Sequence, residues 1–326
     1  MTLVVADTSP VRYLILAGAI ETLPKLYDSV VIPAAVRTEL SHPSAPSEVR
    51  SWISKPPTWI MIQTPERVQA ELNLGQGELE AIALAQELNA AIILLDDRHA
   101  RETAAAKGLT VAGTLGVLEK AAIAGLLDLR LTLELLRKTN FRADEKLFVD
   151  TMARVKEQLA LNKLNLLSPD EFIRIVGPVF EHSPWIAEET WPKRPFASVE
   201  QLHKALCKTV QNAGEEKQLA LIRAHPDLVG KLALAGSLTK ESTGEQASAG
   251  LDKLTPEEIE LFQKRNAAYQ EKFGFPFVIC ARLNQKEAIL DGFKVRLHHS
   301  REQEIQTALA EIFKIAELRL RDLTHA

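Results

Sequence analysis

The feature that most constrains the fold is a change in hydrophobic pattern part-way along the chain. In the first half, short runs rich in valine, isoleucine and leucine alternate with stretches whose apolar residues recur at helical spacing. The runs that indicate buried strands are residues 3–6, 29–32, 60–62 and 91–95. Helical stretches between them include residues 78–88 and 97–106. Strand and helix in repeated order favour a parallel sheet covered by helices, so this half is predicted to be α/β.

The second half has no comparable series of strand-like runs. Its apolar residues recur at spacings near 3.6 residues, which indicates helices, and prolines such as Pro226 and Pro276 separate them. The predicted helices span residues 184–190, 199–210, 215–223, 257–273, 287–297 and 302–323. This pattern predicts an all-α second domain. We therefore expect two domains, residues 1–160 and residues 161–326, with a boundary set to within several residues.

Composition and charge exclude several classes of protein. The 326 residues carry a formal net charge of -4, so charge alone gives no reason to expect a nucleic-acid partner. Two cysteines, Cys207 and Cys280, are too few for a disulfide framework and fit a reducing compartment. No apolar run approaches the roughly 20 residues of a spanning helix, and Asp7 interrupts the first apolar run too early for a signal peptide. We expect a soluble, cytoplasmic protein without a membrane partner.

Several acidic residues of the first half follow predicted strands or lie on the helices next to them, near the carboxyl ends of the strands, where parallel sheets bind ligands. Asp7 follows the first predicted strand, Asp96 and Asp97 follow the fourth, and Glu39 and Glu78 lie on the helices between them. The carboxyl ends of parallel strands open onto one crevice. Grouped carboxylates favour a divalent cation, and Mg²⁺ or Mn²⁺ can activate water for phosphodiester cleavage. Taken singly, each acid is better explained as a strand-end turn, a helix-start carboxylate or a solvated surface group, and only the order and setting of the group favour a metal site.

The stretches around these acids resemble those of the PIN-domain ribonucleases, in particular a toxin-like branch. The resemblance covers about residues 2–150 and includes Val-Val-Ala-Asp-Thr-Ser-Pro at 4–10 and Leu-Leu-Asp-Asp-Arg-His-Ala-Arg at 94–101, with residues 31–40, 75–85 and 113–118. It implies RNA as a partner and an Mg²⁺ or Mn²⁺ site formed by Asp7, Glu39, Glu78 and Asp97, with Asp96 as the alternative to Asp97. The third acid of that family is usually aspartate, where this chain has Glu78.

In the second half, His225 precedes Pro226, and proline disfavours helix at the residue before it. We therefore expect His225 at an extended corner where a helix ends. With an ordinary pKa near 6.5, an imidazole there can pass a proton in either direction at physiological pH. A surface or structural histidine is the alternative, because the chain contains other histidines with no such setting, among them His298 and His299.

Two further features point to a ligand site. Small residues surround Glu245 and Gln246, whose side chains suit the recognition of an amide or ureido group. The same spacing fits a capping box in which Ser242 begins a helix, and both interpretations stay open. Arg319 lies on the apolar stripe of the last predicted helix, where a guanidinium needs an anionic partner unless its stem only snorkels to water.

Together these stretches resemble the 2-oxo-4-hydroxy-4-carboxy-5-ureidoimidazoline (OHCU) decarboxylases. The resemblance covers about residues 162–325 and includes Phe-Glu-His-Ser-Pro-Trp-Ile-Ala at 180–187, His-Pro-Asp-Leu at 225–228 and Lys-Phe-Gly-Phe-Pro-Phe at 272–277. It extends to residues 194–196, 244–246, 249–251 and 314–320 and to Tyr269. The family is all-helical and commonly forms a homodimer. It uses no cofactor and makes (S)-allantoin during urate degradation.

The resemblance also implies roles for individual residues. The implied catalytic residues are His225, which handles the proton, Glu245, which orients it and holds the substrate, and Arg319, which neutralises or orients the pocket. The implied substrate contacts are Pro226, Ser242, Thr243, Gly244, Gln246 and the backbone of Phe277, Val278, Ile279, Cys280 and Ala281. The expected partner is a small ureidoimidazoline substrate.

The sequence therefore predicts an OHCU decarboxylase fused to a PIN-like, metal-dependent ribonuclease. In a first alternative, the nuclease half carries the main role. In a second, the PIN-like half has lost catalysis and serves binding or oligomerisation. The full set of four acids favours a nuclease, whereas Glu78 in the third acidic position argues against one.

Overall fold

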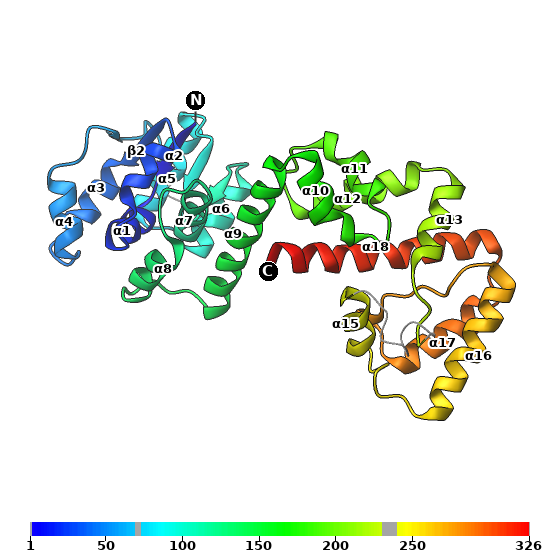
Figure 1. The fold of residues 1–326 in the computed structure, drawn as a ribbon. Helices are drawn as coiled ribbons and strands as arrows, with labels where there is room; N and C mark the ends of the chain where they lie inside the picture. The colour runs from blue at the N-terminus through cyan, green and yellow to red at the C-terminus, as the bar shows by residue number, and fades with distance from the viewer. Residues whose placement is uncertain (1, 69–72, 230–239, 326) are drawn as a thin grey trace. The chain divides into compact units, whose positions relative to one another are not determined.

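The computed structural model describes residues 2–68, 73–229 and 240–325 (Figure 1). Contacts within the chain divide it into two compact units, Met1–Lys156 and Glu157–Ala326. The division falls inside a long helix, α9 (Glu145–Leu166). The predicted architecture, a parallel sheet in the first half and helices in the second, is confirmed in outline.

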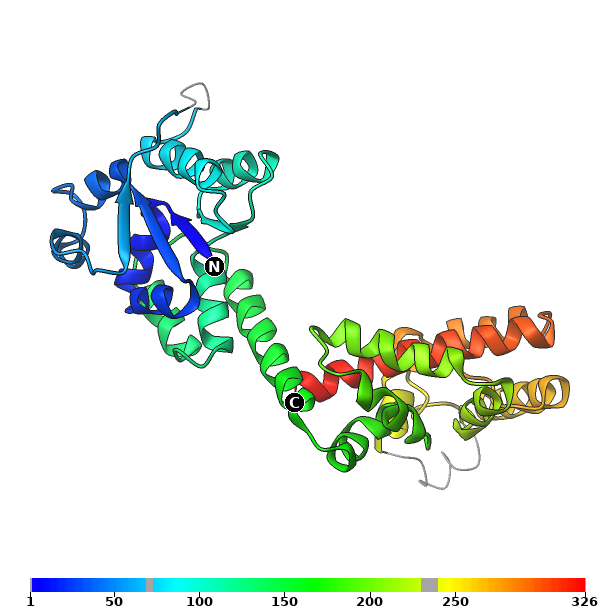
Figure 2. The ribbon, with the colours of Figure 1, turned by 90° about the horizontal axis from the view of Figure 1, so that it is seen from above.

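Five parallel strands form the sheet of the first unit, in the order β3-β2-β1-β4-β5 (Figure 2). Their bounds are β1 (Leu3–Ala6), β2 (Ser29–Pro33), β3 (Ile60–Gln63), β4 (Ile92–Leu94) and β5 (Val111–Ala112). The four predicted strands are present to within one residue at each end. The fifth has only two residues, too few for a hydrophobic pattern to indicate a strand. The central strand β1 pairs with β2 and with β4, so the chain reverses its strand order beside β1.

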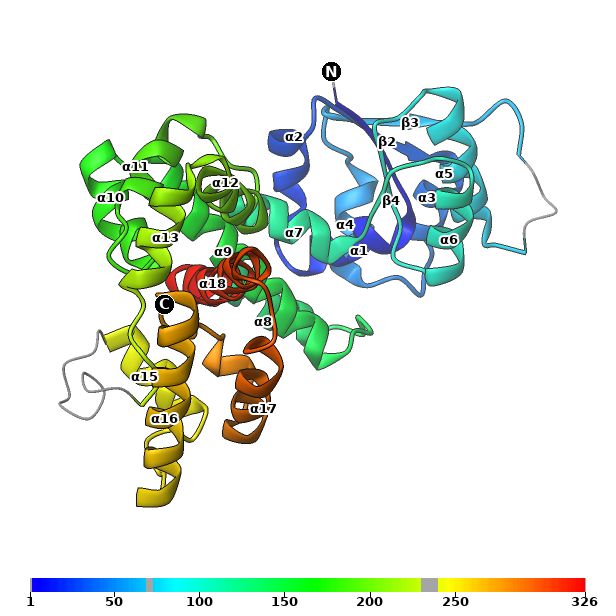
Figure 3. The same cartoon turned by 90° about the vertical axis from the view of Figure 1, so that its right-hand side faces the viewer.

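Helices cover both faces of this sheet because successive strand residues point to opposite sides. Val4 belongs to a core that includes residues of α1, α7 and α8, whereas its neighbour Val5 packs with residues of α5 and α6 (Figure 3). The helices are α1 (Thr8–Leu16), α2 (Leu23–Leu26), α3 (Ala34–Leu40), α4 (Ser47–Ser54), α5 (Gln76–Glu87), α6 (Arg98–Ala106), α7 (Thr114–Ile123) and α8 (Leu129–Arg137), with a 3-10 turn η1 (Ile20–Thr22). The two-sided burial explains why the strands are almost continuously apolar.

The described residues of the second unit are helical. They form α10 (Pro169–Val176), α11 (Trp185–Thr190), α12 (Val199–Asn212), α13 (Glu215–Ala224), α15 (Lys240–Ser248), α16 (Pro256–Phe273), α17 (Lys286–Arg296) and α18 (Arg301–His325), with 3-10 turns η2 (Gly177–Val179), η3 (Trp191–Lys193) and η4 (Ala281–Leu283). The six helices that the hydrophobic spacing predicts are present, each displaced by two residues or fewer at its ends. Among the described residues, no helix is long and apolar enough to cross a membrane.

The last helix, α18, contributes residues to the core of this unit (Figure 1). Its apolar stripe includes Ile305, Leu309 and Ile312, and all three are buried in one core. The same core contains Leu202 of α12 and Tyr269 of α16. Helix α18 at the end of the unit packs against η2, α12 and α13 at its beginning, so residues along it can reach parts of the chain that are far apart in sequence.

The separate cores of the two units predict that a core defect in one leaves the other intact. Leu202 is fully buried, so Leu202→Ala should lower the free energy of unfolding of the second unit by about 2–5 kcal/mol. Native-state hydrogen exchange, followed by peptide in each unit, measures the two effects separately. Leu166→Ala is the matched control because Leu166 is 86% exposed. An equal loss of protection in both units would show that they unfold as one.

Candidate active site

A small cavity in the second unit gathers residues from the end of α13, helix α15, the segment 277–281 and helix α18. Its lining consists of His225, Pro226, Leu228, Ser242, Glu245, Gln246, Phe277, Val278, Ile279, Ala281, Ile315 and Arg319. The structure therefore brings together the three residues predicted to be catalytic. The cavity measures only about 30 Å³, which is room for one water molecule.

His225 stands at the corner where α13 ends, in the extended conformation expected before proline. Its Nδ1 lies 2.9 Å from the carbonyl oxygen of Leu221, one turn back on α13. A carbonyl can only accept a hydrogen bond, so Nδ1 carries the proton. In the neutral ring, Nε2 therefore keeps its lone pair.

The surroundings of His225 favour this neutral ring. Burial lowers the pKa of His225 to about 4. The Leu221 carbonyl and the Glu181 carboxylate oppose that shift, whereas the positive charge of Arg319 reinforces it. At neutral pH the imidazole is uncharged, and its Nε2 is a proton acceptor.

Arg319 is buried and does not snorkel to water. Its Nε and Nη2 donate to the two carboxylate oxygens of Glu245, each at 2.8 Å, and its Nη1 donates to Glu181 at 2.9 Å. A fork of this kind is the geometry in which arginine binds carboxylates most strongly. Burial lowers the pKa of Arg319, but the bonds and charges of Glu245 and Glu181 outweigh it, so the pKa is raised. The guanidinium is permanently charged.

Glu181 is a charged residue of this site to which the sequence analysis gave no role. It is 3% exposed and lies 138 positions before Arg319, and its Oε2 also accepts a hydrogen bond from the Ser242 hydroxyl at 3.2 Å. The signals for it were the stretch 180–187 and the requirement of a buried Arg319 for an anionic partner. That requirement does not identify which of the chain's many acids supplies the charge.

The stretch that supplies Ser242 and Glu245 is helical. Helix α15 spans Lys240–Ser248, so Ser242 lies inside the helix, and of the two open interpretations the capping box is wrong. The Glu245 side chain instead accepts two hydrogen bonds from Arg319. Gln246 accepts a hydrogen bond from the Val229 N–H at 3.2 Å, which fixes its amide.

Three of the predicted substrate contacts do not line the cavity. Thr243 and Gly244 are exposed on α15. Cys280 is buried, but among the described residues of the segment 277–281 it is the one whose side chain and backbone are not part of the lining. The other predicted contacts lie where the sequence suggested.

The acids of the first unit also lie close together. Asp7 follows β1 and begins α1, and Glu39 of α3 accepts a hydrogen bond from the Gly77 N–H at 3.0 Å. A Cβ at Gly77 would lie 2.9 Å from both Glu39 carboxylate oxygens and 3.1 Å from Asp7 Oδ1, so only glycine leaves room for the two acids. Burial raises the pKa of Asp7 to about 7, with help from the negative charges of Glu78 and Glu39.

The remaining acids have different surroundings. Glu78 accepts from the Gly75 N–H at 2.9 Å, and the charge of Asp97 contributes to raising its pKa after burial. Asp97 itself caps α6, as its Oδ1 accepts from the Ala100 N–H at 2.9 Å. Asp96 is instead bound by Thr114, through the backbone N–H at 2.8 Å and the hydroxyl at 2.6 Å. This places Asp97, and not Asp96, among the neighbours of Glu78.

Within the described residues, no group of three or more histidine, cysteine or acidic side chains has a geometry that could hold a metal ion. The donors are nevertheless all oxygen atoms, the kind that Mg²⁺ and Mn²⁺ prefer. Burial and the charges of neighbouring acids raise the pKa of Asp7 and of Glu78.

Each half of the chain matches a known family model. Residues 165–321 match a family described as OHCU decarboxylase, and residues 3–157 match a PIN domain. The OHCU decarboxylase of Halalkalicoccus jeotgali is 45% identical over 167 residues, which cover 51% of this chain and 93% of that protein. The enzyme of Haloferax volcanii is 44% identical over 163 residues, covering 50% and 95%. The chain belongs to the OHCU decarboxylase family.

In another relative, the part that matches this chain is only about a third of the protein. The uric acid degradation bifunctional protein of Bacillus sp. (strain TB-90) is 39% identical over 165 residues, which cover 51% of this chain but only 32% of that protein. All the lining residues of the His225 cavity fall within the part that matches the OHCU decarboxylase family. The four acids fall within the part that matches the PIN domain.

The lowered pKa of His225 predicts how the stability of the OHCU decarboxylase domain depends on pH. Between about pH 4 and the ordinary value of 6.5, the unfolded chain binds a proton at His225 that the folded protein does not. The free energy of unfolding should therefore rise with pH across this window. Urea unfolding at about pH 4.5 and pH 7 should show a larger loss for the parent than for His225→Gln. Equal losses would contradict the assignment of a neutral, buried ring.

Proposed function

We propose that residues of the second domain catalyse the decarboxylation of OHCU to (S)-allantoin, with His225, Glu245 and Arg319 as the catalytic residues. The observation that carries this proposal is the pairing of a neutral His225, whose Nε2 is unprotonated, with a fixed guanidinium in one cavity. The substrate OHCU carries a carboxylate and a hydroxyl on its ring. The permanent positive charge can bind the carboxylate, and the proton acceptor can take the proton of the hydroxyl.

The reaction moves one electron pair, takes up one proton from water and shifts a second proton from oxygen to carbon. The bond between the ring carbon and the carboxylate breaks, CO₂ leaves, and the electron pair passes to the imine nitrogen of the ring, which takes up the proton from water. The ring hydroxyl must then lose a proton and the neighbouring carbon must gain one. Nε2 of His225 accepts the first proton and returns a proton to carbon, so the residue acts as base and then as acid. Delivery from one face gives one enantiomer.

The charged residues place the substrate. The substrate carboxylate competes with Glu245 for the fork of Arg319, and Glu181 keeps that guanidinium in position from its other side. Glu245, once released, is free to orient His225 and to accept from the ureido group. Pro226, Ser242, Gln246 and the backbone of residues 277–279 and 281 complete the contacts. The electron pair is held by the substrate's own ring, so the proposal includes no cofactor.

Replacement of His225 tests this proposal directly. His225→Asn removes the proton acceptor, and kcat should fall by about 100-fold or more. The assay is allantoin formation from freshly generated substrate with chiral product analysis. His298→Asn is the matched control, because His298 is exposed and lies outside the cavity. Turnover by His225→Asn at the parent rate, in a protein with the parent's thermal unfolding midpoint, would reject the role of His225.

We also propose that the first domain is a metal-dependent nuclease with RNA as its substrate. The observation in favour is the contact of Asp7 and Glu39 with Gly77, which brings two carboxylates together at the carboxyl end of the central strand. Asp7, Glu39, Glu78 and Asp97 would hold Mg²⁺ or Mn²⁺. When bound, such an ion supplies the activated water for phosphodiester cleavage. A PIN-like domain that only binds a partner is the competing proposal.

Metal binding separates these two proposals. Isothermal titration with Mn²⁺ should detect a site whose affinity falls at least about tenfold in Asp7→Asn and in Asp97→Asn, because each loses a ligand. Asp96→Asn, which can keep its bonds to Thr114, should bind Mn²⁺ like the parent. Cleavage of a labelled single-stranded RNA should follow the same order. Absence of Mn²⁺ binding by the parent would favour the domain that only binds a partner.

A further inference from the structure

Four residues of the segment 277–281 line the cavity, and two charged side chains that do not line it bond peptide groups of this segment. Arg296 Nη1 donates to the Val278 carbonyl at 2.7 Å. Glu311 Oε2 accepts from the Cys280 N–H at 2.8 Å. These two anchors flank Ile279, which lines the cavity, and neither Arg296 nor Glu311 lines it.

Peptide geometry carries the effect of both anchors to Ile279. In a trans peptide the carbonyl and the following N–H point in opposite directions, and the cis bond recorded in the chain is Arg194-Pro195. Holding the Val278 carbonyl on Arg296 therefore turns the Ile279 N–H to the opposite side. Holding the Cys280 N–H on Glu311 does the same for the Ile279 carbonyl. Among the residues that the structure describes, neither group of Ile279 has a hydrogen-bond partner.

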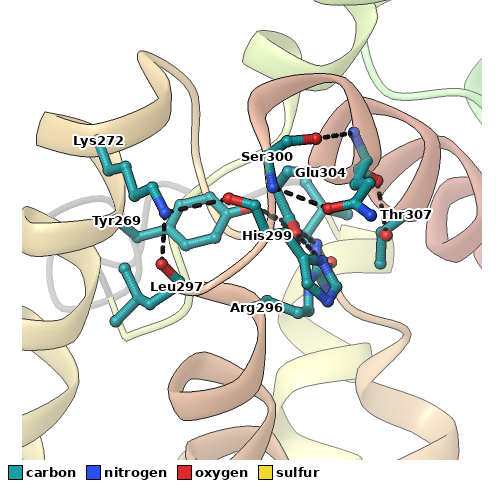
Figure 4. Close-up of polar contacts among 10 residues, drawn as sticks. Tyr269, Lys272, Arg296, Leu297, His299, Ser300, Glu304 and Thr307 are labelled. Carbon is teal, nitrogen blue, oxygen red and sulfur yellow. Dashed lines mark hydrogen bonds and ion pairs between the residues drawn. The ribbon is translucent and has the colours of Figure 1, made fainter.

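Arg296 is itself held rigidly (Figure 4). Its Nε donates to Glu304 at 2.6 Å, and Glu304 is fully buried and also bonds the Tyr269 hydroxyl. His299 Nδ1 lies 2.8 Å from the other oxygen of Glu304. The Arg296 guanidinium lies 4.2 Å from the centre of the Phe277 ring. With these partners in place, Arg296 has one position, and the Val278 carbonyl is fixed by it.

Glu311 is anchored on α18. Its side chain is 12% exposed, and its Oε1 accepts from the exposed Lys314 at 2.6 Å. Glu304, Glu311 and Arg319 follow one another at intervals of seven and eight residues, so they lie on one face of α18. On that face, Glu304 bonds Arg296 and Glu311 bonds the Cys280 N–H. Arg319 bonds the carboxylates of Glu181 and Glu245.

We propose that Arg296 and Glu311 are positioning residues that present the N–H and C=O of Ile279 as a fixed donor–acceptor pair to the amide or ureido part of the substrate. This inference rests on the proposed decarboxylase function. An amide offers one acceptor and one donor, so a paired backbone N–H and C=O recognises it without a charged side chain. Because Arg296 and Glu311 already fix the backbone of Ile279, its N–H and C=O lose little conformational entropy when the substrate binds.

Substitutions at Glu311 separate positioning from general stability. Glu311→Leu removes the acceptor for the Cys280 N–H, whereas Glu311→Gln keeps an acceptor and removes only the charge. Glu311→Leu should raise KM for OHCU about three- to tenfold, the loss expected for one hydrogen bond, with a smaller effect on kcat. Glu311→Gln should restore the parent KM. Lys314→Met, which removes the other partner of Glu311, is the matched control and should leave KM unchanged.

A second variant tests the other anchor in case Glu311→Leu does not fold. Arg296→Lys keeps a positive charge beside Glu304, but one ammonium cannot replace a fork that serves Glu304 and Val278 together. It should also raise KM more than kcat changes. A folded Glu311→Leu or Arg296→Lys protein with the parent KM would overturn the positioning role, as would an equal defect in Glu311→Leu and Glu311→Gln. Absence of turnover by the parent would instead overturn the decarboxylase function itself.

Discussion

The site depends on the buried ion cluster of Arg319 with Glu245 and Glu181. Taking three charges out of water is costly, and the structure offsets this cost with a two-bond fork to Glu245 and further bonds to Glu181 and Ser242. Removing the guanidinium alone would leave two carboxylates buried beside each other. The cluster also joins segments that are distant in sequence, so the cavity exists only when helix α18 is in place.

Burial beside this cluster accounts for the state of His225. Burial lowers the pKa of the imidazole, the Glu181 carboxylate opposes that shift and the charge of Arg319 reinforces it. The Leu221 carbonyl then decides which nitrogen of the neutral ring carries the proton. The same guanidinium attracts a substrate carboxylate. Burial, the Leu221 carbonyl and the ion cluster thus act together on the cavity. Glu304 and Glu311 of the same helix, α18, bond Arg296 and the Cys280 N–H.

Much of the fold follows from hydrophobic spacing, and the site follows only in part. Helical periodicity placed Arg319 on the buried stripe of α18, and the proline rule placed His225 at an extended corner. Local sequence could not show that Glu245 pairs with Arg319, so the pattern around Ser242 suggested a helix cap. The contact of Glu181 with Arg319 could not be predicted for the same reason, because long-range contacts are set by packing. In the first domain, spacing alone could not separate Asp96 from Asp97, whose side chains have different partners.

The most direct test is chiral analysis of the product that the full-length, unmodified protein forms from freshly generated OHCU. Decay in solution protonates the carbon from both faces and gives both enantiomers. An enzyme that delivers the proton from one imidazole gives one. The account predicts accelerated formation of (S)-allantoin in clear excess. A racemic product formed no faster than in buffer would contradict it.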